Sequence, residues 1–249
     1  MANNGTGKNG LRVEGLDAGY GAVRVLDKVS MHVGDGETVT LLGTNGNGKS
    51  TLIKCLMGLV RPTAGKVTAT IDGKDYDLSQ YETEAIVNLG IALVPEGRRL
   101  FPKLTVEENL LLGAYRDAAR SKIAANIDFA YTAFPRLKER RTQLAGSMSG
   151  GEQQMLALAR AVMTAPKILL IDEPSVGLAP IFVSRTIEKI AELKERYNLT
   201  VLMAEQNFNQ AIKIADRGYV IVHGHIEFEG KTRDELRNNE TIKKLYLGI

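Results

Sequence analysis

A glycine-rich stretch that ends in lysine and serine is the part of the sequence best suited to chemistry. It consists of Gly43, Thr44, Asn45, Gly46, Asn47, Gly48, Lys49, Ser50 and Thr51. An apolar, β-branched run precedes it, and a helical pattern closed by Gly58 follows it. Strand, glycine loop and helix in this order predict a phosphate-binding loop, because backbone N–H groups and the helix start converge on phosphate oxygens. The spacing places Lys49 for the β- and γ-phosphates and the Ser50 hydroxyl for Mg²⁺.

Two adjacent carboxylates, Asp172 and Glu173, follow a second apolar run at residues 168–171. A buried parallel strand delivers such residues to the sheet edge at which α/β folds bind ligands. We predict that Asp172 holds Mg²⁺ through a water molecule. Glu173 is then placed to polarise the attacking water, as a base or an orienting group. An apolar run followed by Asp-Glu can mark only the end of a strand. Because a phosphate loop precedes it in this chain, we interpret the pair as functional.

A third motif, formed by Ser149, Gly150, Gly151 and Glu152, opens a predicted helix. Free N–H groups at the positive end of a helix form an anion site. A serine N-cap alone would explain Ser149. It would not explain two glycines, which weaken a helix start unless the backbone must approach something closely.

The composition of the 249 residues is that of an ordinary globular protein, with 44% hydrophobic and 24% charged residues. A formal charge of +3 gives no electrostatic case for nucleic acid as a partner. Cys55 is the single cysteine, so an internal disulfide is impossible. No run reaches the length of a membrane span, and the first ten residues lack the apolar region of a signal peptide. We therefore expect a protein of the reducing cytoplasm.

The elements that must position these motifs alternate between strands and helices on both sides of a charged, helical middle. This order predicts a mostly parallel α/β core. The expected strands are short ones in 11–33 around a turn at 17–21, then 38–42, 66–71, 90–94, 168–171 and 200–203, and a hairpin of 219–222 with 226–228. The expected helices are 51–57, 82–88, 106–112 behind a Thr105–Glu108 capping box, 126–134, 151–164 and 181–196, with two short ones at the C-terminus.

Together the three motifs resemble the ATP-binding-cassette (ABC) ATPases, in which Ser-Gly-Gly-Gln or its Glu variant is the diagnostic signature. The resemblance continues in the family's order along nearly the whole chain. Tyr20 stands where an aromatic side chain stacks on adenine, residues 104–110 match the start of the helical subdomain, and residues 175–179 match the loop after the second carboxylate. The resemblance implies an α/β P-loop NTPase core with a mostly parallel sheet, an antiparallel β subdomain and a helical subdomain.

The same resemblance implies how the chain is divided and paired. We expect a disordered arm at 1–10 and a single ABC ATPase domain at 11–249, with its core at about 11–96 and 165–249 and its helical subdomain at about 97–164. The ATPase would work as a head-to-tail pair. Each ATP would lie between one subunit's phosphate loop and the other's signature, Ser149 to Glu152.

Two positions depart from the family pattern. The family normally has Gln at the strand end that meets Mg²⁺ near the γ-phosphate, and this chain has Glu96, an oxygen ligand with a charge that a nearby arginine could balance. The family normally has His as a γ-phosphate contact, and this chain has Gln206. A glutamine amide can donate a hydrogen bond to phosphate but carries no proton or charge. The expected catalytic set is Lys49, Glu173 and Gln206, and the expected metal set is Ser50, Asp172 and Glu96.

Several short stretches, at 96–99, 175–180, 205–207 and 246–248, resemble the ATP-binding subunits of bacterial branched-chain amino acid importers of the LivF type. That branch implies ATP and Mg²⁺ as cofactors and a peripheral place on the cytoplasmic face of the inner membrane. It also implies membrane permeases, a paralogous ATPase or a second copy, and an external substrate-binding protein as partners. Relatives that import urea, amides or polar amino acids leave the cargo open. A soluble cassette ATPase acting on ribosomes or DNA is disfavoured by the chain length and the nearly balanced charge.

Overall fold

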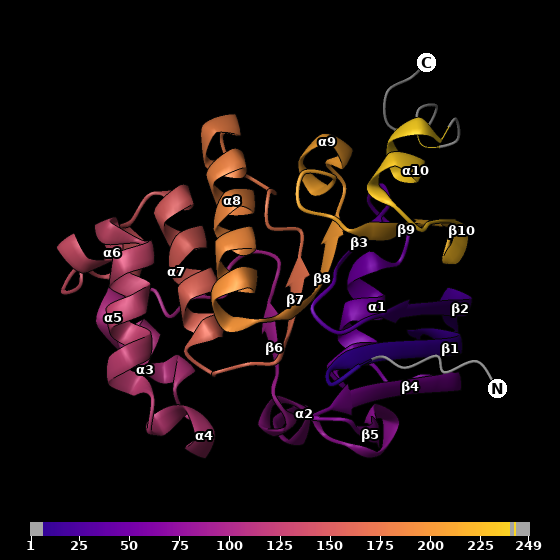
Figure 1. The fold of residues 1–249 in the computed structure, drawn as a ribbon, viewed down its shortest axis with the longest axis horizontal. Coiled ribbons are helices and arrows are strands. Elements are labelled where there is room, and N and C mark those ends of the chain that lie inside the picture. Colours follow the sequence, from indigo (N-terminus) through magenta and orange to yellow (C-terminus); the bar gives the residue numbers. More distant parts are fainter. Residues whose placement is uncertain (1–6, 240–241, 243–249) are drawn as a thin grey trace.

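The computed structural model describes residues 7–239 and 242 and contains two sheets in layers (Figure 1). The larger sheet has the strand order β10-β9-β3-β8-β7-β6, and the smaller one has the order β2-β1-β4-β5. The strands are β1 Gly10–Tyr20, β2 Val23–Val33, β3 Thr38–Leu42, β4 Ala64–Ile71, β5 Lys74–Asp77, β6 Ile91–Val94, β7 Ile168–Asp172, β8 Thr200–Glu205, β9 Arg217–Val222 and β10 His225–Gly230. The α-helices are α1 Lys49–Leu56, α2 Thr83–Leu89, α3 Val106–Gly113, α4 Asp117–Arg120, α5 Ile123–Ala133, α6 Pro135–Glu139, α7 Gly150–Val162, α8 Pro180–Tyr197, α9 Phe208–Ala211 and α10 Arg233–Asn238, with 3₁₀ turns at Leu78–Gln80 and Ala145–Ser147.

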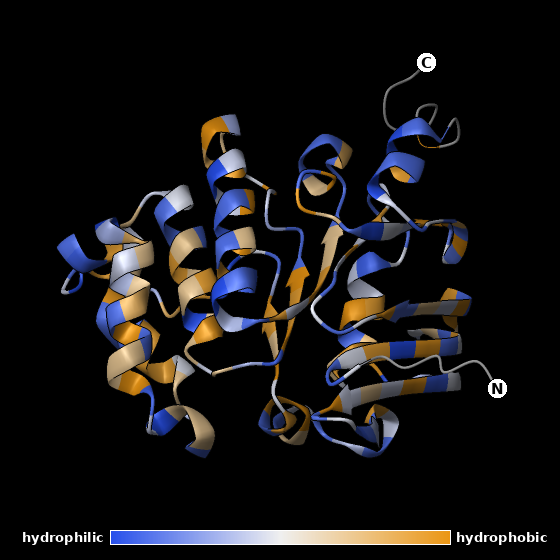
Figure 2. Ribbon diagram, viewed as in Figure 1, coloured by the Kyte–Doolittle hydropathy of each residue, from blue (hydrophilic) through white to orange (hydrophobic). Residues whose placement is uncertain are grey.

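The larger sheet confirms the predicted α/β core. Strands β9, β3, β8, β7 and β6 are parallel, and β10 alone pairs antiparallel, in the predicted hairpin with β9. Alternate residues of its central strands enter two different cores: Met203 of β8 packs on the side of α7 and α8, while Leu202 packs on the side of α1. Burial on both faces explains why these strands are continuous apolar runs, as the hydrophobic colour along β7 illustrates (Figure 2).

The smaller sheet corrects one expectation. Residues 11–33 form two long antiparallel strands rather than short strands around a turn at 17–21. The chain turns later, at residues 21–22. Asp17 does not need a turn to satisfy its side chain, because its carboxylate accepts hydrogen bonds from Arg24 and from the Lys28 N–H. Strand β1 has register shifts on either side of Asp17, and these irregularities let the strand continue through its polar residues.

The helices between β6 and β7 gather at one end of the molecule, with the smaller sheet at the other (Figure 1). The predicted capping box of Thr105 and Glu108 is confirmed, since both of its hydrogen bonds are present at the start of α3. Helix α7 packs against α3, α8 and β6, so it joins this helical part to the larger sheet. Two four-residue helices, α4 and α9, were not predicted.

The two ends of the described chain refine the predictions there. Lys8 and Asn9 donate backbone hydrogen bonds to Asp35, and Gly10 begins β1, so the last part of the expected arm at 1–10 belongs to the fold. Helix α10 is one of the two expected C-terminal helices; the other, and the motif at 246–248, lie outside the described residues. Within the described residues, no helix is both long and apolar enough to span a membrane.

Candidate functional site

The phosphate loop joins β3 to α1 at the carboxyl edge of the parallel strands. Gly48 is the N-cap of α1, and its φ of +98° is a backbone conformation that glycine adopts more easily than other residues. A Cβ at this position would lie 2.7 Å from the Leu26 side chain. Asn47 donates to the Thr44 hydroxyl at 2.8 Å and accepts the His223 N–H at 2.9 Å. The loop is thus held from inside and by the β9–β10 hairpin, which leaves the α1 N-terminus as the predicted anion site.

Lys49 lies at the centre of the site, with 3% of its surface exposed. Its ammonium donates to the carbonyls of Gly43 at 2.8 Å and Thr44 at 3.1 Å, and forms an ion pair with Glu173 Oε1 at 2.9 Å. The sequence did not predict this pair. It brings the two residues expected to handle the γ-phosphate and the attacking water into direct contact.

Ser50 and Asp172 meet across the loop, because the Ser50 hydroxyl donates to Asp172 Oδ1 at 3.0 Å. Burial raises the pKa of Asp172 to about 6; the bond from Ser50 opposes the rise, and the nearby charges of Glu173 and Glu96 add to it. A hydroxyl and a buried carboxylate close to two further carboxylates fit Mg²⁺, which takes one or two protein oxygens and completes its shell with phosphate and water. The residues present therefore suit the metal.

Asp172→Asn is expected to stabilise the protein without added Mg²⁺ and to abolish Mg²⁺-dependent hydrolysis of ATP. Because the folded-state pKa lies above the ordinary value of 3.8, folding favours the protonated carboxyl, and stability falls as pH rises from 3.8 to about 6. The loss above that range is on the order of 2–3 kcal/mol, and asparagine avoids it. Thermal unfolding should show a small difference from wild type at pH 4 and a higher melting temperature for the variant at pH 8.

Asp17→Asn is the matched control for this prediction. Asp17 is a buried carboxylate that Arg24 and a backbone N–H neutralise, so its removal should lower stability. Equal stability of Asp172→Asn and wild type at both pH values would contradict the conclusion that burial of the charged Asp172 carboxylate destabilises the fold.

Glu173 follows the last residue of β7 with φ +46°, a left-handed conformation that is rare for a residue with a side chain. Its N–H donates to the Ala204 carbonyl at 2.9 Å, which ties it to β8. Backbone strain of this kind persists where the surroundings enforce it, often at functional sites. The turn aims the carboxylate back at Lys49 instead of along the strand.

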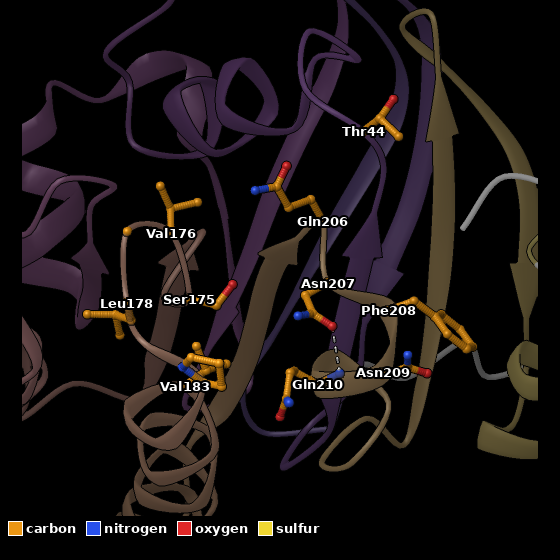
Figure 3. A pocket seen from close by; sticks show the side chains of 12 residues that line it. Thr44, Ser175, Val176, Leu178, Val183, Gln206, Asn207, Phe208, Asn209 and Gln210 are labelled. Carbon is orange, nitrogen blue, oxygen red and sulfur yellow. Dashed lines mark hydrogen bonds between the residues drawn. The ribbon is translucent and has the colours of Figure 1, made fainter. Parts of the chain in front are cut away.

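Gln206 follows β8 and lines a cavity of about 560 Å³ together with Thr44 and Ser175 (Figure 3). The structure therefore places the predicted γ-phosphate contact beside the phosphate loop and the loop after Glu173. Glu205, just before it, is fully buried, and no role was predicted for it from the sequence. The signal available was a carboxylate at the end of an otherwise apolar strand.

Glu96 is exposed and lies close enough to Asp172 for its charge to raise the pKa of that residue. The arginine expected to balance it is not paired with it among the described residues. Instead the Arg98 guanidinium donates to Gln153 Oε1 at 3.3 Å and lies against Gly150, in the first turn of α7. The loop after β6 is therefore joined to the signature helix.

The signature residues start α7 as predicted. Contacts within this chain account for some of these residue types. Ser149 and Glu152 form a reciprocal capping box. A Cβ on Gly151 would lie 2.4 Å from the Phe182 ring, so close packing against α8 requires that glycine. Gly150 faces only the end of the flexible Arg98 side chain, at 3.3 Å. The pair of glycines predicted a close approach to the backbone. At Gly151 the group that approaches is Phe182 of the same chain, whereas at Gly150 the backbone is left accessible to another molecule.

Gly151→Ala is expected to lower the free energy of unfolding by about 1–3 kcal/mol, because the methyl group overpacks against Phe182. Gly150→Ala is the matched control and should change stability by less than about 1 kcal/mol, since Arg98 can move away. Urea unfolding of both variants measures the difference. Equal effects would show that α7 and α8 can separate without cost.

Tyr20, at the end of β1, has 47% of its surface exposed. Its hydroxyl accepts a long hydrogen bond of 3.4 Å from Lys54, on the helix that the phosphate loop opens. The structure thus brings the expected adenine-stacking ring to the side of α1. The Lys54 ammonium also lies over the ring, 5.8 Å from its centroid, so the exposed ring lies beside the positive charge of Lys54.

Comparison with known proteins adds to this geometry. A family model described as ABC transporter matches residues 26–176. The chain is 46% identical over 229 residues to the high-affinity branched-chain amino acid transport ATP-binding protein BraG of Pseudomonas aeruginosa, covering 92% of this chain and 95% of that protein. It is 36% identical over 239 residues to the probable branched-chain amino acid transport ATP-binding protein LivF of Archaeoglobus fulgidus, covering 96% and 99%. The crystal structure of a nucleotide-free ATP-binding cassette from an ABC transporter matches with a TM-score of 0.81 at 27% identity, over 97% of this chain and 100% of that one.

Proposed function

The chain belongs to the ABC transporter family of ATP-hydrolysing subunits, and from that premise we propose that it powers the import of branched-chain amino acids. One observation supports hydrolysis above the others: Lys49, Asp172 and Glu173 converge, with Ser50, on one edge of the parallel sheet. The similarity to the P. aeruginosa and A. fulgidus proteins supports the cargo.

The residues divide the work of phosphoryl transfer as follows. Backbone N–H groups of residues 43–51 cradle the phosphates, and the ammonium of Lys49 neutralises charge at the γ-phosphate. To do so it must exchange its contact with Glu173, which frees that carboxylate to orient and deprotonate water. Gln206, which lines the cavity together with Thr44, donates a hydrogen bond to the γ-phosphate. Ser50 and Asp172, with Glu96 nearby, would hold Mg²⁺, which when bound neutralises charge on the β- and γ-phosphates.

The site is completed by a second subunit in this proposal. The N-terminus of α7, with Ser149 and Gly150, lies on the exposed end of the helix and would meet the ATP of a partner cassette. The partner is a paralogous ATPase or another copy of this chain. The pair would sit on the cytoplasmic face of the bacterial inner membrane, bound to the permease subunits that receive cargo from an external binding protein.

An apolar groove at the junction between the larger sheet and the helical part supports the contact to the permease. It has a volume of about 580 Å³, and four of its lining side chains are large, apolar and exposed. They are Leu59, Phe101, Leu112 and Tyr115. Contiguous exposed apolar surface of this kind marks an interaction site. We assign this groove to a cytoplasmic segment of the permease. Arg99, which also lines the groove, belongs to the same loop as Glu96, so a segment bound there would contact a loop of the ATP site.

Leu112→Glu is expected to reduce uptake by the assembled transporter at least tenfold, because a charge would enter the apolar contact. ATP binding by the isolated subunit should be unchanged. Leu111→Glu is the matched control: it is the preceding residue of α3, is similarly exposed, and lies outside the groove. Equal loss of uptake in both variants would argue against the groove as the docking site.

Reconstitution in proteoliposomes tests the proposed cargo. The purified chain is combined with permease subunits and a substrate-binding protein of a branched-chain amino acid importer, and ATP-dependent uptake of labelled leucine is compared with uptake of labelled urea. Saturable leucine uptake that requires ATP is expected. Transport of urea but not leucine would replace the cargo while leaving the ATPase assignment intact.

A further inference from the structure

Glu205 stands at the centre of the larger sheet, at the carboxyl end of β8. Strand β8 runs between β3, which leads into the phosphate loop, and β7, which leads into Asp172 and Glu173. In the strand register Leu42 is opposite Glu205, and Asp172 is opposite Ala204. The side chain of Glu205 has no exposed surface.

Glu205 contacts three of the loops that make up the site. One carboxylate oxygen accepts the Ser175 N–H at 3.0 Å, and the other accepts the Asn207 N–H at 2.9 Å. Its backbone carbonyl accepts the Gly43 N–H at 3.4 Å. One residue is therefore bonded to the loop after Glu173, to the segment that carries Gln206, and to the start of the phosphate loop.

A buried carboxylate is a costly way to fill the centre of a sheet. Among the described residues, no lysine, arginine or histidine forms an ion pair with Glu205, and the nearby charge of Glu173 is of the same sign. Burial raises the pKa of Glu205, although its hydrogen bonds from Ser175 and Asn207 oppose that rise. An apolar side chain at this position would pack without the desolvation cost. The hydrogen bonds to two separate loops are what an apolar residue could not supply.

We propose that Glu205 is a positioning residue for ATP hydrolysis, which fixes the loop after Glu173 and the backbone of Gln206 in one arrangement. The inference rests on the proposed function, since it assigns Glu205 to the same reaction. The Glu205 carboxylate is hydrogen-bonded to the N–H of Asn207, and Gln206 is the residue between these two. The Gln206 side chain lines the cavity together with Ser175 and Thr44 (Figure 3). A neutral amide has no charge to orient it toward phosphate, so its direction depends on this backbone.

The test compares Glu205→Gln with wild type in the assembled transporter. Glutamine has nearly the same volume, but its NH₂ group would face one of the two N–H donors, so one bond is lost. We expect kcat for ATP to fall about tenfold or more, with KM and ATP affinity of the isolated subunit changed less than threefold. Glu37→Gln is the control. That carboxylate lies before β3, at the opposite end of the sheet, pairs with Arg217, and should affect stability alone.

A double variant separates positioning from a general loss of structure. If Glu205 acts through Gln206, the combined loss in Glu205→Gln with Gln206→Ala should be smaller than the product of the single losses. Independent, multiplicative losses would overturn the proposal. So would an unchanged kcat in the folded Glu205→Gln protein, or a parallel loss of kcat and ATP affinity. Absence of ATP hydrolysis in the wild-type transporter would instead overturn the proposed function, and this inference with it.

Discussion

Glu173→Gln is expected to lower ATP turnover by about 10²–10⁴-fold while ATP binding is kept or strengthened. Loss of a general base accounts for a fall of that size. The gain in binding has a structural origin, because the Glu173 carboxylate competes with phosphate for the ammonium of Lys49, at 2.9 Å in this structure. An uncharged amide competes less. Phosphate release and nucleotide titration on the same protein measure both effects.

The variant should also accumulate as a closed pair of cassettes with ATP held between them, because hydrolysis no longer releases it. Glu173→Asp serves as a control that keeps the charge but shortens the side chain. Phosphate release within about twofold of wild type in Glu173→Gln would remove Glu173 from the role of base.

Lys49→Ala is expected to abolish ATP binding, with a loss of affinity of at least about 100-fold. The variant removes the cation that would attract the phosphates and leaves the buried Glu173 carboxylate unpaired, so a lost attraction and an added repulsion both weaken ATP binding. Breaking a buried ion pair on one side also lowers the free energy of unfolding by about 3–5 kcal/mol. Nucleotide titration and urea unfolding are the measurements.

The double variant Lys49→Ala with Glu173→Gln separates the effect of the unpaired Glu173 charge from the effect of the missing lysine. It removes the unpaired charge and should recover much of the lost stability, but it should not recover ATP binding, since no cation is restored. Normal nucleotide affinity in Lys49→Ala would show that the glycine loop does not bind phosphate.

The elements that sequence patterns predicted well are those with strong local determinants. The Thr38–Leu42 strand and the helix at Lys49 follow from an apolar run and a glycine loop, and the start of α3 follows from its capping box. The turn predicted at 17–21 failed because Asp17 finds partners in the neighbouring strand, which a one-dimensional pattern does not contain. Helices α4 and α9 are too short to show a periodic pattern.

Contacts within the site were harder to predict than its members. The motifs indicated Lys49, Asp172 and Glu173, but the ion pair between Lys49 and Glu173 depends on the left-handed backbone of Glu173. The packing of Gly151 on Phe182 joins residues that are 31 positions apart in the sequence and meet only when α7 packs on α8. The role of Glu205 depends on two loops that converge on one strand end. Each of these is a tertiary contact between segments that local patterns treat separately.

The central claim, that each ATP lies between the phosphate loop of one cassette and the signature of another, is tested most directly by complementary defects. In a Glu173→Gln transporter, one cassette carries Lys49→Ala and the other carries arginine at the position of Ser149. Head-to-tail pairing puts both defects in one site and leaves the other site complete, so the pair should retain one ATP. Retention of no ATP, as when both cassettes lack the loop lysine, would contradict the claim.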